Sequence, residues 1–405
     1  MAMPTAPMTD MNPAAMFLMN NMSGTAVNPA AWPMPMLMRR VGSWNTMFMA
    51  EAFVNDTQQS GPRGGDKLYS PNWLMADAEH RAGENGAFQF QLMLSAEPAT
   101  IADRRYPLLF QTGETAFGKP IVDGQHPHNF IMSMGFQYAL SLSENTTLEI
   151  YFAPVGDPAL GPIAYPHRAS AMEIPEAPLA HHLQDSTHIS DEVLTAGLAY
   201  KKIKLEASGF YGSEPGENRW TIQAGPMNSW AARLWYFPGK RWAAQVSAGH
   251  LTHPEALEPG DQTRTTASVE YSKPMQGQAW SSSLIWGRVH NTFTKRNLDS
   301  YTAESVLPIR RRNFITGRIE LVDKDELFTG QPEIDEFLDV FYGSTFRIGD
   351  YTIGYTREFE LFTHVETGIG ANIEAYSLPG AIKPYYGDHP IGGNVFIRFR
   401  LKPRS

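Results

Sequence analysis

Two short segments of this chain place several histidines beside an acidic side chain. The segment Asp123–Asn129 contains an H-x-H pair, and the segment His181–His188 contains an H-H pair, an aspartate and a third histidine. Neutral imidazole is a good ligand for copper, zinc or nickel, and a nearby carboxylate can bind the ion or fix the ring tautomer. We interpret these residues, with the histidine of a third segment, as candidate metal ligands: His126, His128, His167, His181, His182, Asp185 and His188. The alternative interpretation is structural, with the imidazoles hydrogen-bonding the loops to one another.

Methionines gather near the start of the chain. Seven of the first 22 residues are methionine, and Met34, Met36 and Met38 follow in a stretch interrupted by proline. Because Pro and Asn are scattered among them, we expect residues 1–42 to form a mobile arm rather than a helix. Thioether sulfur selects soft ions such as Cu(I) and Ag(I), and a flexible arm can bind them without a preformed site. These three methionines join the candidate metal set, and a copper ion is the ligand we expect. The alternative is an arm that binds nothing.

A hydrolytic site is a further alternative. Ser186 lies beside Asp185, with histidines close by in the sequence, so a Ser–His–Asp set is conceivable. This serine does not lie in a G-x-S-x-G motif. We therefore expect a protein that is not an enzyme and keep a surface hydrolase only as a third hypothesis.

The elements that must position these side chains are strands. From Gly42 onward, apolar and polar residues alternate with a period of two, as where Ile203 and Leu205 alternate with Lys204 and Glu206. Charges recur on one face of many strands, which predicts that this face lines a polar interior. Met47 and Met49 share that face of the first strand. Strands are predicted at 43–55, 67–80, 86–97, 129–142, 146–155, 192–201, 203–212, 228–237, 241–251, 263–272, 278–290, 300–310, 313–323, 344–359, 366–377 and 392–402.

The connections between these strands alternate between short turns and long loops. That alternation is typical of an outer-membrane barrel, in which short turns face the periplasm and long loops face the outside. The sequence therefore predicts an all-β fold: a transmembrane antiparallel β-barrel of about 16 strands (14–18) over residues 43–405, with long extracellular loops and the arm 1–42 before it. Ten of the twelve histidines then lie on the outer side, the exceptions being His80 and His364.

The composition agrees with an exported barrel. There are no cysteines, 12% of the residues are aromatic, and no run of 18 apolar residues could form a membrane-spanning helix. A net charge of -9 argues against nucleic acid as a partner. A soluble propeller would show repeats of about 40 to 50 residues, and we find none. The first residues lack a secretory signal, so we expect a mature form located in the bacterial cell outer membrane.

Charged residues on the polar face of the later strands could form an internal ladder. Its members would be Arg318, Glu320, Arg347, Glu358, Glu374, Arg398 and Arg400. Such ladders tune the selectivity of a pore, and they also brace a barrel by ion pairing.

Three motifs carry a resemblance to a family of uncharacterised bacterial outer-membrane β-barrels: Gln58–Gly65, Asp123–His128 and Tyr165–Ala171. The resemblance runs through nearly all of residues 29–402 and implies the barrel fold. The chain also resembles copper-resistance protein B, in which a Met/His-rich arm precedes an outer-membrane barrel; here the arm contains Met but no His.

Together these observations predict a porin-like channel or transporter that handles copper or another soft metal ion. Its expected partners are outer-membrane lipid, small solutes or metal ions, and periplasmic metal-handling proteins. The alternative is a general diffusion porin whose loop histidines are purely structural.

Overall fold

The alternation of side chains decides which way each strand faces. In a computed structural model that describes residues 11–256, 258–275, 277–329 and 344–402, Ile203 and Leu205 are 48% and 55% exposed, whereas Lys204 and Glu206 are buried. The apolar face therefore points outward and the charged face points into the barrel, as the sequence predicts. An apolar outer belt around a polar interior is the pattern of a barrel that lies in lipid.

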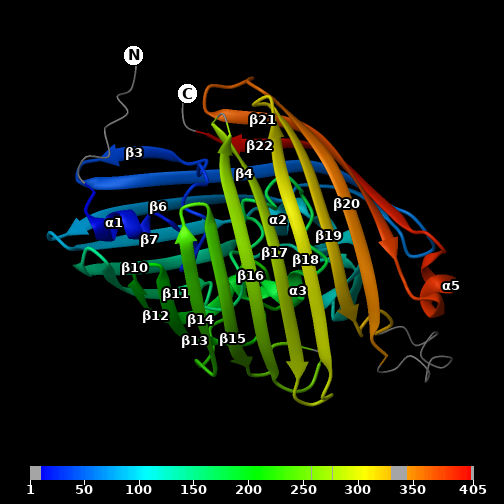
Figure 1. The fold of residues 1–405 in the computed structure, drawn as a ribbon. Helices are drawn as coiled ribbons and strands as arrows, with labels where there is room; N and C mark the ends of the chain where they lie inside the picture. Colours follow the sequence, from blue (N-terminus) through cyan, green and yellow to red (C-terminus); the bar gives the residue numbers. More distant parts are fainter. Residues whose placement is uncertain (1–10, 257, 276, 330–343, 403–405) are drawn as a thin grey trace.

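The strands close into one antiparallel barrel (Figure 1). Eighteen labelled strands occupy sixteen positions in the wall, because two positions are each filled by two shorter strands in series. The wall strands are β3 (Leu37–Val41), β4 (Trp44–Gln59), β5 (Asp66–Tyr69), β6 (Asn72–Ala82), β7 (Gly86–Leu94), β10 (Ile131–Ser143), β11 (Thr146–Gly156), β12 (Ser190–Tyr200), β13 (Ile203–Tyr211), β14 (Ser229–Gly239), β15 (Trp242–Leu251), β16 (Gln262–Met275), β17 (Gln278–Asn291), β18 (Asn297–Ile309), β19 (Asn313–Lys324), β20 (Phe346–Phe359), β21 (Val365–Ser377) and β22 (Ile391–Leu401).

Both doubled positions flank β4. β22 pairs with Glu51–Gln59 of that strand and closes the barrel, while β3 pairs with Trp44–Phe48. On the other side, β6 pairs with Asn45–Ala52 and β5 with Asn55–Gln58. Pro71 lies between β5 and β6, and it interrupts the strand because it has no N–H to donate to the ladder. The predicted strand number of sixteen and the short–long alternation of connections are confirmed.

The first described segment does not form a mobile arm. Residues 11–36, which we call the N-terminal insert, enter the barrel as α1 (Pro13–Leu18) and a hairpin of β1 (Asn21–Ser23) and β2 (Ala26–Val27). Pro and Asn do not break the helix because they begin it. Asn12 caps the helix by accepting from the Ala15 N–H, and Pro13 takes the first helical position, where its missing donor costs nothing.

The N-terminal insert fills the lumen at the end of the barrel where the short turns lie. Asn12 donates to the carbonyls of Gly83, Glu84 and Gly86 in the β6–β7 turn. Lys204 and Arg233 donate to Thr25 in the hairpin. The described part of the chain begins just before α1 and ends just after β22, where the Lys402 N–H donates to the carbonyl of His364 in the short β20–β21 turn, so both of these points lie at this end of the barrel. Residues 1–10 of the predicted arm lie outside the described residues.

A second segment fills the rest of the lumen. The connection between β11 and β12, residues 157–189, folds inward and is buried throughout except at His182 and Ser186, which are partly buried. We call it the lumenal loop. It contains α3 (His181–Gln184) and the one-turn helix η2 (Ser186–His188). It binds opposite walls of the barrel, since Ala159 and Gly161 donate to Ser208 and Ser247, while Gln184 donates to Thr302.

The long connections at the other end cover the mouth. Residues 95–130 form α2 (Glu97–Thr100), η1 (Ala102–Arg104) and a hairpin of β8 (Tyr106–Ala116) and β9 (Lys119–Gln125). The connection between β21 and β22 forms η3 (Gly380–Ile382) and α5 (Lys383–Tyr386). Phe110 of the hairpin stacks on Tyr386 of α5 with ring centroids 4.3 Å apart. These contacts join the mouth loops into one apolar layer above the lumenal loop.

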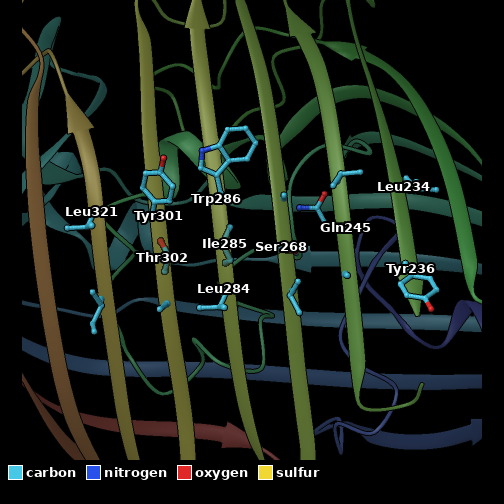
Figure 2. A pocket seen from close by; sticks show the side chains of 16 residues that line it. Leu234, Tyr236, Gln245, Ser268, Leu284, Ile285, Trp286, Tyr301, Thr302 and Leu321 are labelled. Carbon is cyan, nitrogen blue, oxygen red and sulfur yellow. The ribbon is translucent and has the colours of Figure 1, made fainter. Parts of the chain in front are cut away.

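The wall is hollowed on its outer side. A groove of about 700 Å³ runs over β14 to β19 and is lined by apolar side chains. Figure 2 shows Trp286 and Tyr301 on neighbouring strands of this groove, with Leu284 further along β17. Small residues such as Ala267 and Ala303 leave the hollow between the larger ones. Among the described residues, no helix has the length and apolarity to cross a membrane.

Candidate metal centre in the lumen

Five of the predicted histidines lie next to one another. His126 and His128 come from the segment after β9, and His181, His182 and His188 come from the lumenal loop. Their ring centroids are separated by 5.5 Å (His126–His182), 5.2 Å (His182–His181), 5.2 Å (His181–His188) and 5.4 Å (His188–His128). We call this row the histidine chain. Two segments that are far apart in the sequence therefore form one continuous row of imidazoles.

Carboxylates hold both ends and the middle of the histidine chain. Asp185 lies 2.7 Å from Nδ1 of His181 and accepts from Arg168 at 2.8 Å. Glu97 lies 3.0 Å from Nδ1 of His128 and also accepts from its backbone N–H. These are the outer contacts that orient imidazole ligands in metal sites. Nε2 of His126 lies 3.1 Å from Oε1 of Glu114 at the far end.

Burial keeps four of the lumenal imidazoles neutral near pH 7. Burial lowers the pKa of His126 and of His167 to about 3 and holds the pKa of His182 and His188 well below the usual range. Burial opposes the charge of Asp185, but Arg168 and His181 outweigh it and keep its pKa well below the ordinary value. His126, His167, His182 and His188 therefore each have a lone pair on one ring nitrogen at neutral pH.

Several of those lone pairs have no partner. Both ring nitrogens of His182 are buried without a hydrogen bond, as are Nε2 of His188 and Nδ1 of His167. The ring of His182 packs against the backbone at Gly113, where an added Cβ would lie 2.7 Å from the imidazole. Unsatisfied buried polar atoms are uncommon in folded proteins, and an ion is one explanation for them.

Methionines form a second group in the same lumen. Six are buried in one apolar cluster and two more pack against it: Met22, Met49, Met75, Met93, Met132, Met172, Met34 and Met36. We call these eight the methionine cluster. They come from the N-terminal insert, from the strands β4, β6, β7 and β10, and from the lumenal loop. The fold thus gathers thioethers that are spread over residues 22–172.

His167 joins the two groups. Its Nε2 lies 3.2 Å from Sδ of Met93, and its ring contacts the edge of Trp73 at 4.6 Å. A hollow of about 10 Å³ beside it is lined by Met22, Met93, Met132, His167 and His188, among others. A space of this size holds about one water or one ion. It cannot hold an organic solute.

The predicted metal ligands thus divide into three sets. The five residues of the histidine chain and Asp185 are in contact, while His167, Met34 and Met36 belong to the methionine cluster or touch it. Met38 lies in β3 opposite Met47 and is in neither group. Within the described ranges, no group of three or more His, Cys, Asp or Glu side chains has the geometry to hold an ion. The imidazoles alone are therefore not a preformed metal site.

Sequence reasoning missed the methionines that contact His167. Met22 lies in the segment predicted to be a mobile arm, and Met93 lies in the predicted strand 86–97. Their signal was the period of two: Gln89, Gln91 and Met93 share the lumenal face of β7, and all three are buried. Met132 shares a face with Met134 in the sequence pattern, but the register of β10 shifts between Ile131 and Ser133, so Met132 is buried whereas Met134 is only partly buried.

Ser186 has no geometry of a nucleophile. Its hydroxyl donates to Glu214 at 3.2 Å and accepts from Arg264. Glu214 and Arg264 form an ion pair with each other, and the Ser186 hydroxyl lies between them. A nucleophilic serine would instead have an imidazole base as its hydrogen-bond partner.

The predicted charge ladder lies largely in the lumen. Arg318 binds Glu304 at 3.1 Å, Glu320 accepts from Leu179 and Ala180 of the lumenal loop, and Arg398 and Arg400 bind Glu173 of that loop. Glu358 binds Arg398, and Glu374 accepts from Gln59 at 2.9 Å. The ladder therefore anchors the lumenal loop to the wall.

The assignment of Arg347 to this ladder is wrong. Arg347 faces outward with its side chain 50% exposed and binds Asp323 at 2.8 Å. The reason is the period of two: residues 347 and 358 of β20 differ by an odd number, so they face opposite sides of a regular strand.

Comparison with known proteins supports the architecture. No family model and no curated protein matches the chain. Among solved structures, the anion-selective porin from Comamonas acidovorans superimposes with a TM-score of 0.52 at 10% identity, over 88% of this chain and 100% of that one. Salmonella typhi OmpF, in complex with daunomycin, gives a TM-score of 0.55 at 8% identity, over 90% of this chain and 100% of that one. These likenesses show the fold: the chain is a porin-like β-barrel, and its apolar outer belt is of the kind that lies in lipid.

Proposed function

We propose that this barrel binds and conducts soft metal ions, with Cu(I) as the natural cargo, rather than organic solutes. The observation that carries the proposal is the methionine cluster: eight thioethers from distant parts of the chain lie together inside the lumen. Methionine is uncommon on the polar inner wall of a barrel, where charged and amide side chains usually lie. Thioether ligands select Cu(I) over Mg²⁺, Ca²⁺ and Zn²⁺.

The filled lumen supports an ion as the cargo. The hollow beside His167 measures about 10 Å³, and the hollow at Glu114 among the mouth loops measures about 20 Å³. Each accepts something the size of one water. A general diffusion pore needs an aqueous channel, and in this state the N-terminal insert and the lumenal loop occupy that space.

Titration of the purified full chain with Ag(I), a stable mimic of Cu(I), tests the proposal. The triple variant Met22→Leu, Met93→Leu, Met132→Leu keeps the volume and apolarity of the cluster but removes sulfur. We expect it to weaken Ag(I) binding on the order of 100-fold. The matched control is Met16→Leu with Met227→Leu, because both of these methionines are exposed. Absence of saturable Ag(I) binding by the unmodified chain would refute the proposal.

The likeness to porins keeps a general diffusion pore as the second candidate. That function predicts a large steady conductance in planar bilayers that Ag(I) does not alter. It also predicts that replacing His181 and His182 leaves the conductance unchanged. The soft-metal proposal predicts instead a low conductance at rest, since the lumen is filled.

A further inference from the structure

The small hollow at His167 is a junction between two kinds of ligand. Met22 from the N-terminal insert, Met93 from β7 and Met132 from β10 line it on one side. His167 and His188 of the lumenal loop line it on the other. The hollow therefore lies where the methionine cluster ends and the histidine chain begins.

The contacts of His167 leave room for a cation. Its Nε2 faces the sulfur of Met93 at 3.2 Å, and its Nδ1 is buried without a hydrogen bond. Thioether sulfur is a weak hydrogen-bond acceptor, so this contact is a poor substitute for a normal partner. A soft ion bound by the nitrogen and the sulfur together would satisfy both atoms.

Beyond this junction the path leads toward the mouth. Nε2 of His188 has no partner, because its hydrogen bond to the Asp185 carbonyl, at 2.7 Å, uses Nδ1. The next rings are His181 and His182, at successive centroid distances of 5.2 Å. His182 contacts His126 at 5.5 Å, and neither of its nitrogens is engaged.

The path ends at an acidic hollow. His126 lies 3.1 Å from Glu114, which lines a space of about 20 Å³ together with Glu255, Glu258 and Glu326. These residues belong to the mouth hairpin and to two long loops. Glu114 also pairs with Arg219, and burial together with neighbouring carboxylates raises the pKa of Glu255, Glu258 and Glu326. These carboxyls therefore hold protons that a cation can displace, and the route ends at oxygen ligands next to the last imidazole.

We propose that a single Cu(I) ion moves by ligand exchange from a thioether–imidazole site of Met22, Met93, Met132 and His167, along the histidine chain, to the acidic hollow at Glu114. The inference rests on the soft-metal function proposed above and adds its route. Each step as far as His126 exchanges one neutral ligand for another, and the last step replaces an imidazole by the carboxylate of Glu114. The copper stays Cu(I) throughout, because no electron is transferred. The lumen can then stay filled while the ion passes, since each move spans one ring-to-ring contact.

His182→Phe is the variant that tests the route. A phenyl ring keeps the shape that packs against Gly113, and it removes two nitrogens that have no hydrogen bond to lose. If the imidazole were only structural, this change would be neutral or stabilising. The route predicts that Ag(I) uptake into vesicles containing the full chain falls about tenfold or more, while Ag(I) binding at the methionine cluster is unchanged. His253→Phe is the control, because this histidine is exposed at the mouth.

The results separate the two proposals. Unchanged uptake with intact binding would overturn the route and leave the soft-metal function standing. No binding by the unmodified chain would overturn both. Should His182→Phe fail to fold, the ¹⁵N resonances of the rings in the unmodified chain provide the second measurement. The route requires the His182 and His126 nitrogens to shift once Ag(I) exceeds the methionine site, and unshifted resonances would overturn it.

Discussion

At Gly287, the wall of the barrel has no room for a side chain. A Cβ there would lie 2.1 Å from the carbonyl oxygen of Leu183 and 3.0 Å from the side chain of Gln184, because α3 packs directly on β17. We predict that Gly287→Ala displaces α3 and destabilises the lumenal loop by about 1–3 kcal/mol, the usual cost of overpacking. Limited proteolysis within residues 157–189 measures this effect.

Gly317→Ala is the control for that measurement. Gly317 is also a strand glycine, but the nearest atom to its added Cβ lies at 3.8 Å, which is ordinary contact. We expect no change in proteolysis for this variant. Equal sensitivity of the two variants would contradict the close packing of α3 on the wall.

Glu176 makes the insertion of the lumenal loop into the barrel less favourable as the pH rises. Burial, and then the nearby Glu374, raise the pKa of Glu176 to about 8. A raised pKa means that the folded loop holds a proton that the released loop loses above pH 4.5. Insertion of the loop is therefore fully favoured below pH 4.5 and weakens by about 1.4 kcal/mol per unit until pH reaches about 8.

Proteolysis of the lumenal loop between pH 5 and pH 8 measures that dependence. Glu176→Gln should remove much of it, because an amide keeps an oxygen for Asn55 or Asn372 and carries no charge at any pH. Other groups titrate in the same range, so the informative quantity is the difference between the variant and the unmodified chain. A difference that does not vary with pH would contradict the assignment.

At the scale of elements, the wall strands could be predicted from the sequence, but the two segments that fill the lumen could not. The period of two gave all sixteen wall strands, since each wall residue faces either lipid or lumen. It did not show that Asn12 and Pro13 begin a helix, or that residues 157–189 fold inward. Those choices depend on distant partners: the carbonyl of Gly86 for Asn12, and Glu304 and Arg398 for the lumenal loop. The sequence identified the histidines as candidates from their residue type. Their contact with one another depends on the inward fold of the lumenal loop, which the sequence did not predict.

One buried arginine holds the lumenal loop in place. Arg168 is paired with Glu304 at 2.6 Å and with Asp185 at 2.8 Å, and its side chain is almost fully buried. Removing one partner of a buried ion network typically costs about 3–5 kcal/mol, because the other charges remain without compensation. We therefore predict that Arg168→Met releases the loop and raises the single-channel conductance in planar bilayers.

Arg288→Met is the matched control for that prediction. Arg288 forms a similar pair with Asp299 at 2.8 Å, but on the outer surface and with its side chain 46% exposed. Exposed pairs contribute about 0–1 kcal/mol. Its conductance should equal that of the unmodified chain. A closed channel in both variants would show that the loop is retained by its other contacts.

For the whole molecule, the barrel wall does not depend on the N-terminal insert. The hydrogen-bonded ladder of the wall strands closes without β1 and β2, which form a separate two-stranded sheet. Removal of residues 1–36 should therefore leave a folded barrel that is open at the end where the short turns lie. Among the described wall strands, buried carboxylates outnumber buried lysines and arginines. Around the vacated space these include Glu51, Asp77, Glu79, Glu149 and Glu206.

A water-filled lumen with this excess of carboxylates should select cations. The reversal potential of the truncated chain across a salt gradient measures that selectivity, and we predict the sign of a cation-selective pore. Lys204 and Arg233 together balance Glu149 and Glu206, and Arg400 pairs with Glu51, so the excess negative charge at this end comes from Asp77 and Glu79. An anion-selective current would contradict this reading of the wall. It would also remove the electrostatic reason for expecting a cation as the cargo.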